Sequence, residues 1–220
     1  MIKVSNLLLD LIDKKTVLFL SGGSTPKDLY AKIAKDKKLQ VGAVAMVDER
    51  YGKRFHENSN ELMIKNTGLL SYLEEKNIRF YPILEDKTRE KTAQNYDETV
   101  RFLLSHFPKS VAILGIGTDG HIAGIAPDRM DFKNPLFNKD RKDLLVSEFN
   151  DSKGEFGQRI TMTFSALSKI DKLIVLVFGD KKKRALELMN EEGSMEEVPA
   201  RFFKRPDIAK KTILITDQRV

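Results

Sequence analysis

The sequence predicts an α/β protein whose mostly parallel sheet is covered by helices on both faces. Short apolar runs typical of buried strands alternate along the chain with segments whose apolar residues recur at helical spacing. Parallel strands need long crossover connections, usually helices, so this alternation favours a parallel sheet. A length of 220 residues is sufficient for one hydrophobic core, and we expect a single domain over residues 1–220.

The first half of the chain carries the clearest alternation. A helical pattern over Val4–Ile12 precedes a strand over Thr16–Leu20, and a Gly-rich turn leads into a helix that runs through Ala34. Thr25 suits the N-cap of that helix and Pro26 its first helical position. The remaining elements are a strand over Val41–Val47, a helix through Leu62 to Leu70, a strand over Ile78–Ile83, a helix over Lys87–Ser105 and a strand over Ser110–Leu114.

The second half is less regular. We expect an irregular surface segment over Asp128–Arg141 and a polar, mobile loop over Asn150–Gln158. Leu173–Phe178 is the most hydrophobic run of the chain and is typical of a central strand. The other predicted elements are a strand over Arg159–Phe164, a turn or short helix over Ser165–Ile170, a helix from Ala185 to Met189 and a final strand over Thr212–Thr216.

The composition excludes several classes of site. The chain has no cysteine, which rules out disulfides, thiolate metal ligands and cysteine nucleophiles and fits a reducing compartment. No apolar run approaches the roughly 18 residues of a membrane span. Asp10 and Asp13 interrupt the N-terminal apolar patch, which therefore does not resemble a signal peptide. We expect a cytoplasmic protein with no membrane partner.

The net charge of +6 raises the question of nucleic acid. The basic residues are spread along the chain, and no aromatic residues interleave with the small lysine clusters as base-stacking platforms would. A small anionic substrate together with solvated lysines accounts for the charge equally well. We therefore expect no nucleic-acid partner.

The first candidate site is the turn after the Thr16–Leu20 strand. It contains Ser21, Gly22, Gly23, Ser24 and Thr25 and leads directly into a helix. Free backbone N–H groups and the positive end of a helix dipole make such a corner suited to phosphate. The alternative is a tight strand-to-helix turn without a ligand, but two hydroxyls beside two glycines favour an anion.

The second candidate site is Val111–Pro127, a short strand followed by a Gly-rich loop with Asp119 and His121. Glycines such as Gly117 allow sharp turns and a close approach of ligand to backbone. Open α/β sheets bind ligands just beyond the carboxyl ends of their strands, where these two side chains would lie. The alternative is a Gly-rich turn that holds a structural histidine, since a short Gly-containing motif is weak by itself.

Charged residues follow two further strands. Asp48 and Arg50 come after the strand at Val41–Val47, and Lys182 follows Leu173–Phe178. Either group is also compatible with an ordinary solvated turn. Because the carboxyl ends of parallel strands share one edge of a sheet, we expect them beside the two candidate sites, where Arg50 can grip phosphate.

These motifs, in this order, resemble the family of 6-phosphogluconolactonases and glucosamine-6-phosphate deaminases. The resemblance implies a Rossmann-like three-layer sandwich and covers nearly the whole chain. Its landmarks are Ser21-Gly22-Gly23-Ser24-Thr25-Pro26, Asp48-Glu49-Arg50, Ser59-Asn60, Leu114-Gly115-Ile116-Gly117-Thr118-Asp119-Gly120-His121, Arg159-Ile160-Thr161, and Gly179 with Lys182.

The resemblance implies hydrolysis of 6-phosphogluconolactone, with His121 as general base and Asp119 orienting it. The Ser21–Thr25 turn, Arg50, Arg159 and Lys182 would bind phosphate, and Asp48 would contact sugar hydroxyls or position Arg50. Such a reaction requires no metal or cofactor, and the three histidines are too widely separated in the sequence to suggest a metal site. Its partner is a small phosphosugar lactone, and the oligomeric state stays open between monomer and dimer.

Two alternatives concern the branch of the family. Deaminases usually carry an acidic residue five positions after the histidine, where this chain has Ala126. The segment Ile122–Ala126 also departs from the lactonase pattern, which leaves open a phosphosugar-binding protein with little catalysis. We expect the lactonase, because proton shuttling in a deaminase depends more on the missing carboxylate.

Overall fold

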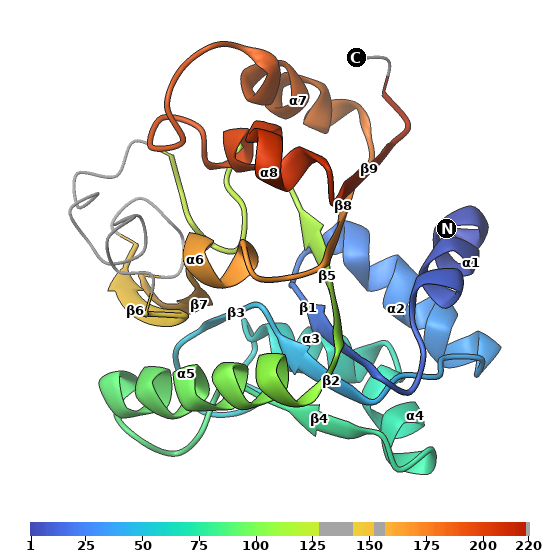
Figure 1. Ribbon diagram of the computed structural model, residues 1–220. Helices are drawn as coiled ribbons and strands as arrows, with labels where there is room; N and C mark the ends of the chain where they lie inside the picture. Colours follow the sequence, from blue (N-terminus) through green and yellow to red (C-terminus); the bar gives the residue numbers. More distant parts are fainter. Residues whose placement is uncertain (128–142, 152–156, 219–220) are drawn as a thin grey trace.

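A six-stranded sheet organises the fold, and every pair of neighbouring strands in it is parallel (Figure 1). The computed structural model describes residues 1–127, 143–151 and 157–218. In the order β4-β2-β1-β5-β8-β9, the strands are Arg79–Tyr81, Ala43–Met46, Thr16–Leu20, Lys109–Gly115, Lys172–Val177 and Thr212–Thr216. The prediction of a mostly parallel sheet is confirmed.

Helices cover this sheet on both sides. Figure 1 shows α1 (Ile2–Leu11) and α2 (Ser24–Asp36) on one side and α5 (Arg89–His106) and α6 (Phe164–Leu167) on the other. The remaining helices are α3 (Asn60–Asn66), α4 (Leu69–Glu75), α7 (Lys183–Asn190) and α8 (Pro206–Ala209), with 3₁₀ turns η1 (Asp180–Lys182) and η2 (Pro199–Lys204). Within the described residues, no helix is both long and apolar enough to cross a membrane.

A second, antiparallel sheet was not expected from the sequence. It consists of β3 (Asp48–Arg50), β7 (Gln158–Met162) and β6 (Val146–Asn150), in that order. Val47 links the two sheets: its N–H donates to the Leu20 carbonyl (2.8 Å), and its own carbonyl accepts from the Met162 N–H (2.9 Å). The chain leaves the parallel sheet here, and the three charged residues that follow pair with β7 instead.

Several predicted boundaries are wrong in detail. The helix expected through Leu62 to Leu70 is two helices, α3 and α4, separated by Gly68 in the left-handed region (φ 81°). Strand β6 was missed, and the strand expected over Arg159–Phe164 ends at Met162, where Thr163 caps α6 instead. The irregular segment predicted over residues 128–141 and the centre of the predicted 150–158 loop lie outside the described residues.

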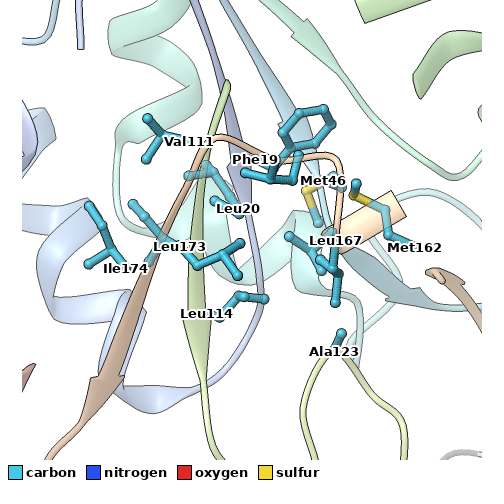
Figure 2. Packing of buried hydrophobic residues seen from close by; sticks show 14 of the residues in the cluster. Phe19, Leu20, Met46, Val111, Leu114, Ala123, Met162, Leu167, Leu173 and Ile174 are labelled. Carbon is cyan, nitrogen blue, oxygen red and sulfur yellow. The ribbon is translucent and has the colours of Figure 1, made fainter. Parts of the chain in front are cut away.

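The hydrophobic core joins the two sheets. One buried cluster contains Phe19 and Met46 of the parallel sheet and Met162 of the antiparallel sheet, all labelled in Figure 2. Phe19 is fully buried. We expect Phe19→Ala to lower the free energy of unfolding by about 3–5 kcal/mol, since it removes a ring and leaves a cavity. Denaturant unfolding would measure this, with the half-exposed Phe102 as control: Phe102→Ala should change stability by no more than about 0.5 kcal/mol.

The order of the strands creates a crevice between β1 and β5. From β1 the chain crosses to β2 on one flank, whereas from β5 the sheet extends to β8 on the other. Leu20 pairs in register with Met46 and with Ile113, so the residues that follow these strands leave the sheet at one edge. Such a switch point is where open α/β sheets bind ligands.

Candidate active site

A cavity of about 420 Å³ opens at this switch point. Its walls come from the turns after β1 and β5, from both ends of the antiparallel sheet and from the turn after β8. All twelve candidate residues line it: Ser21, Gly22, Gly23, Ser24, Thr25, Asp48, Arg50, Gly117, Asp119, His121, Arg159 and Lys182. The structure therefore brings together residues that lie far apart in the sequence.

The turn after β1 presents the N-terminus of α2 to the cavity. The helix begins at Ser24, and Gly23 occupies the N-cap with φ 108°, so the prediction of Thr25 as N-cap is wrong. Only glycine adopts this conformation readily, and a glycine cap has no side chain to satisfy the first N–H groups of the helix. Those groups thus remain available to an anion. Tyr30 fixes the turn from behind by donating its hydroxyl to the Ser21 carbonyl (2.9 Å).

The loop after β5 holds His121 over Gly117. The Gly117 N–H donates to the His121 carbonyl (2.8 Å), and the Gly120 N–H donates to the Gly117 carbonyl (3.0 Å). A Cβ on Gly117 would lie 2.1 Å from both Cε1 and Nδ1 of the imidazole. Glycine is required here because the ring occupies the space that any side chain would need.

His121 and Asp119 form a hydrogen-bonded pair. Nδ1 of His121 lies 2.7 Å from Oδ1 of Asp119, and the backbone N–H of His121 donates to the same oxygen (3.1 Å). Partial burial alone raises the pKa of Asp119, but the hydrogen bonds and charge of His121 outweigh it and lower that pKa to about 2. The ionised carboxylate therefore holds the proton on Nδ1 and leaves Nε2 able to accept one. Both side chains are about half exposed, at 47% and 50%.

Comparison of the sequence with known proteins identifies a family. A family model described as glucosamine-6-phosphate isomerases/6-phosphogluconolactonase matches residues 4–213. The chain belongs to this family. It is 29% identical to a 6-phosphogluconolactonase of Helicobacter pylori over 184 residues, covering 81% of this chain and 74% of the relative. It is 31% identical to one of Synechocystis, covering 84% and 76%.

Solved structures of the family share the fold. A 6-phosphogluconolactonase from Thermotoga maritima superposes with a TM-score of 0.75 at 26% identity, over 98% of this chain and 91% of that one. A second, from Shewanella baltica, gives a TM-score of 0.77 at 22% identity, over 97% and 90%. The α/β fold and the resemblance drawn from the sequence motifs are both confirmed.

Three cations face the cavity, each held by protein groups. Nη1 of Arg50 donates to the Asn60 side chain (2.7 Å) and to the Asn58 carbonyl (2.9 Å). Nζ of Lys182 donates to the Ile116 carbonyl (2.6 Å), and burial lowers the pKa of this lysine while the charge of Asp119 opposes that shift. These contacts anchor the cations before any ligand arrives, which reduces the entropy lost on binding.

The third cation, Arg159, is paired with an acid that the sequence analysis did not single out. Nε of Arg159 donates to Oδ2 of Asp151 (3.0 Å), and both side chains are largely buried at the wall of the cavity. Asp151 was missed because its position depends on the β6–β7 pairing, which no local pattern announced. Its only sequence signal is its place at the start of the polar 150–158 segment.

The segment Ile122–Ala126, which departs from the lactonase sequence pattern, forms a tight turn at a wall of the cavity. Ile122 and Ile125 are fully buried and pair across it, while Ala123 (φ 51°) and Gly124 (φ 69°) occupy its tip. The Thr161 hydroxyl donates to the Ala123 carbonyl (2.8 Å). The wall is therefore built largely from backbone. The apolar residues Ile122, Ala123 and Ile125 of this segment belong to the buried core, and Ala123 is labelled in Figure 2.

Gly124 allows this turn to approach two charged groups of the cavity. A Cβ on it would lie 3.3 Å from both Nη1 of Arg159 and Oδ2 of Asp48. Gly124 also has a positive φ, which L side chains rarely adopt. Close contact and backbone conformation thus both favour glycine here.

A buried carboxylate supports the cavity from behind. Glu49 accepts N–H hydrogen bonds from Arg50 (2.8 Å), Asn60 (2.7 Å) and Glu61 (2.8 Å), the last two at the start of α3. Burial raises the pKa of Glu49 to about 7, against the opposing effect of these hydrogen bonds. The folded protein therefore binds a proton at Glu49 more tightly than the unfolded chain does.

This shift has a consequence for stability. Ionisation of Glu49 should lower the free energy of unfolding as pH rises from about 5 to about 7, by up to roughly 1.4 kcal/mol per pH unit. Glu49→Gln has no carboxyl to ionise at this position. The unfolding free energy of wild type minus that of Glu49→Gln should therefore fall over the same pH range, as measured by denaturant unfolding at several pH values. For Glu74→Gln, at an exposed position, the difference should stay constant. A constant difference for both variants would contradict the shift.

The described residues contain no group of three His, Asp or Glu side chains arranged to hold a metal ion. The acidic groups of the cavity instead bond to the imidazole, to guanidinium groups or to amides. The cavity thus combines an imidazole bonded to a carboxylate with a turn at a helix N-terminus.

Proposed function

We propose that the protein hydrolyses 6-phospho-D-glucono-1,5-lactone to 6-phosphogluconate. The observation that carries the proposal is the His121–Asp119 pair, which opens onto the same cavity as the Gly-rich turn at the N-terminus of α2. A base and a phosphate site in one cavity suit a substrate that carries both an electrophilic carbonyl and a phosphate. The relatives named 6-phosphogluconolactonases support the same reaction.

The phosphate end of the substrate would bind at the Ser21–Thr25 turn. The open N–H groups of the first turn of α2 point at an anion, and the helix dipole favours negative charge there. Arg50 and Arg159 line the same cavity and supply positive charge for the phosphate, whereas Lys182 is assigned to the carbonyl end instead. Asp48, which lines the same cavity, would contact the hydroxyls of the sugar or position Arg50.

The reaction proceeds through attack of water on the lactone carbonyl. Nε2 of His121 accepts a proton from the water as the oxygen bonds to C1, which gives a tetrahedral oxyanion. The C1–O5 bond then breaks, and the imidazolium returns its proton to O5, which becomes the ring-opened hydroxyl. Asp119 stays ionised throughout and stabilises the imidazolium. No atom or electron beyond those of water and lactone is required.

The oxyanion needs a hydrogen-bond donor or positive charge near C1. Nζ of Lys182 donates to the carbonyl of Ile116 in the loop that carries His121, so its charge lies on the same side as the base. We assign it the role of electrostatic stabiliser, beside the backbone N–H groups of the loop. Preorganised charge of this kind stabilises a transition state without further rearrangement.

Two assays on one preparation test the proposal. Lactone hydrolysis, corrected for spontaneous ring opening, should proceed well above background, and glucosamine 6-phosphate should release no ammonia. Ammonia release without lactone hydrolysis would identify a deaminase. Binding of 6-phosphogluconate without either reaction would identify a phosphosugar-binding protein. The proposed cytoplasmic location stays a prediction from the sequence.

A further inference from the structure

The side chain of Asn60 connects two walls of the cavity, the strand β3 and the turn after β1. Its Nδ2 donates to the backbone carbonyl of Asp48 (2.9 Å) and to Oδ2 of the same residue (3.2 Å), and its Oδ1 accepts from Nη1 of Arg50 (2.7 Å). The amide also lies against the backbone of Gly22, because a Cβ there would sit 1.9 Å from Oδ1. Asn60 itself is 1% exposed.

These partners demand an amide. Asp48 offers only oxygen acceptors, so a donor must face it, whereas the Arg50 guanidinium offers only N–H donors, so an acceptor must face it. An amide supplies one of each on a single planar group, with no net charge. A carboxylate would place an oxygen against Asp48, and an aliphatic side chain would leave both charged partners without this contact.

Backbone hydrogen bonds at the start of α3 also hold Asn60 in place. It is the first residue of α3, where Ser59 caps the helix by accepting the Leu62 N–H (3.0 Å) and Glu49 accepts the Asn60 N–H (2.7 Å). These backbone hydrogen bonds fix the position of the Asn60 amide. The amide can therefore hold the side chains of Asp48 and Arg50 in one arrangement.

We propose that Asn60 is a positioning residue that holds Asp48, Arg50 and the Gly22 turn in the arrangement that binds the phosphosugar. This inference rests on the proposed function, in that 6-phosphogluconate is taken as the ligand. It goes further by assigning a contribution to affinity to Asn60, a cavity-lining residue that is almost fully buried. Catalysis by His121, on the loop after β5, would not depend on it.

The discriminating variant is Asn60→Asp. It keeps the size of the side chain but places a carboxylate oxygen beside the Asp48 carboxylate and adds negative charge next to Arg50. We expect the dissociation constant of 6-phosphogluconate, measured by calorimetry at about pH 7.5, to rise about tenfold or more. The kcat for lactone hydrolysis should stay within about threefold of wild type, because the His121–Asp119 pair is untouched.

A pH series separates positioning from general damage. The charged residues hydrogen-bonded to Asn60 are Asp48, Glu49 and Arg50, and all three are present in both the wild type and the variant. The ratio of the variant's dissociation constant to that of wild type therefore isolates the introduced carboxyl. Protonation of this carboxyl restores a donor toward Asp48, so the ratio should fall to about threefold or less near pH 5.

Asn66→Asp is the matched control, since it makes the same change at the exposed end of the same helix. It should leave both the dissociation constant and kcat unchanged. If Asn60→Asp does not fold, as judged by circular dichroism, Asn60→Ser takes its place: a neutral, shorter side chain should raise the dissociation constant without lowering kcat.

Three results would overturn the inference: wild-type affinity in Asn60→Asp or in its serine replacement, a ratio that does not change with pH, or equal loss in Asn66→Asp. Wild-type protein that binds 6-phosphogluconate but hydrolyses no lactone would refute the proposed reaction while leaving the positioning role to be decided by the affinities. Wild-type protein that does not bind it would refute both.

Discussion

His121→Ala is expected to lower kcat for lactone hydrolysis by about 10²–10⁴-fold, the usual contribution of a general base. The imidazole lines the cavity, and its Nδ1 is held by Asp119. Its removal leaves water in the site without a proton acceptor, whereas the phosphate turn is unaffected. The dissociation constant of 6-phosphogluconate should therefore stay within about threefold of wild type. Steady-state kinetics corrected for spontaneous opening, with calorimetry for binding, measure both quantities.

His106→Ala provides the control for this experiment. His106 ends α5, stacks on Phe102 and is absent from the walls of the cavity. Its replacement should leave kcat unchanged. Wild-type turnover in His121→Ala would refute the assignment of the base, and equal losses in the two variants would point to a general loss of folded protein.

Gly117→Ala is expected to lower kcat by about 10²-fold, through geometry rather than through loss of a chemical group. The added methyl would occupy the position of the imidazole, 2.1 Å from Nδ1, so the ring must leave its place above the loop and its bond to Asp119. A displacement of about 1 Å at a reacting group can cost a factor of this size. Affinity for 6-phosphogluconate should change much less than kcat.

Gly115→Ala tests whether any methyl in this segment has the same effect. A Cβ at Gly115 would meet only the Leu176 carbonyl, at 3.8 Å, which is an ordinary contact. We expect kcat to change by less than about threefold. Comparable losses at both glycines would mean that the loop tolerates no substitution, and the steric account of Gly117 would then fail.

Most of the parallel sheet and its helices could be predicted from local sequence patterns. The runs at Thr16–Leu20 and Leu173–Phe178 are fully or almost fully apolar, and such runs in a chain of this length become buried parallel strands. The Gly-rich segments after β1 and β5 marked the edge at which the cavity lies, because ligands bind where the backbone turns sharply past a strand end. These inferences depend only on neighbours in the sequence.

The antiparallel sheet was not predictable in this way. Its strand β3 consists of Asp48, Glu49 and Arg50, whose charges suggest a solvated turn, yet Asp48 and Glu49 are buried. Burial is possible because Asn60 and the first N–H groups of α3 provide hydrogen bonds to them. Those partners lie some ten residues away, and their approach is set by packing.

By itself, the sequence determined the class of fold, the order of its elements, the residue types of the cavity and the family to which they belong. The tertiary structure alone decided that Asp151 pairs with Arg159, that Asn60 joins Asp48 to Arg50, and that the imidazole fills the space above Gly117. Strand and helix patterns follow from local periodicity, whereas contacts within 3 Å depend on the register and crossing of segments that are remote in the chain.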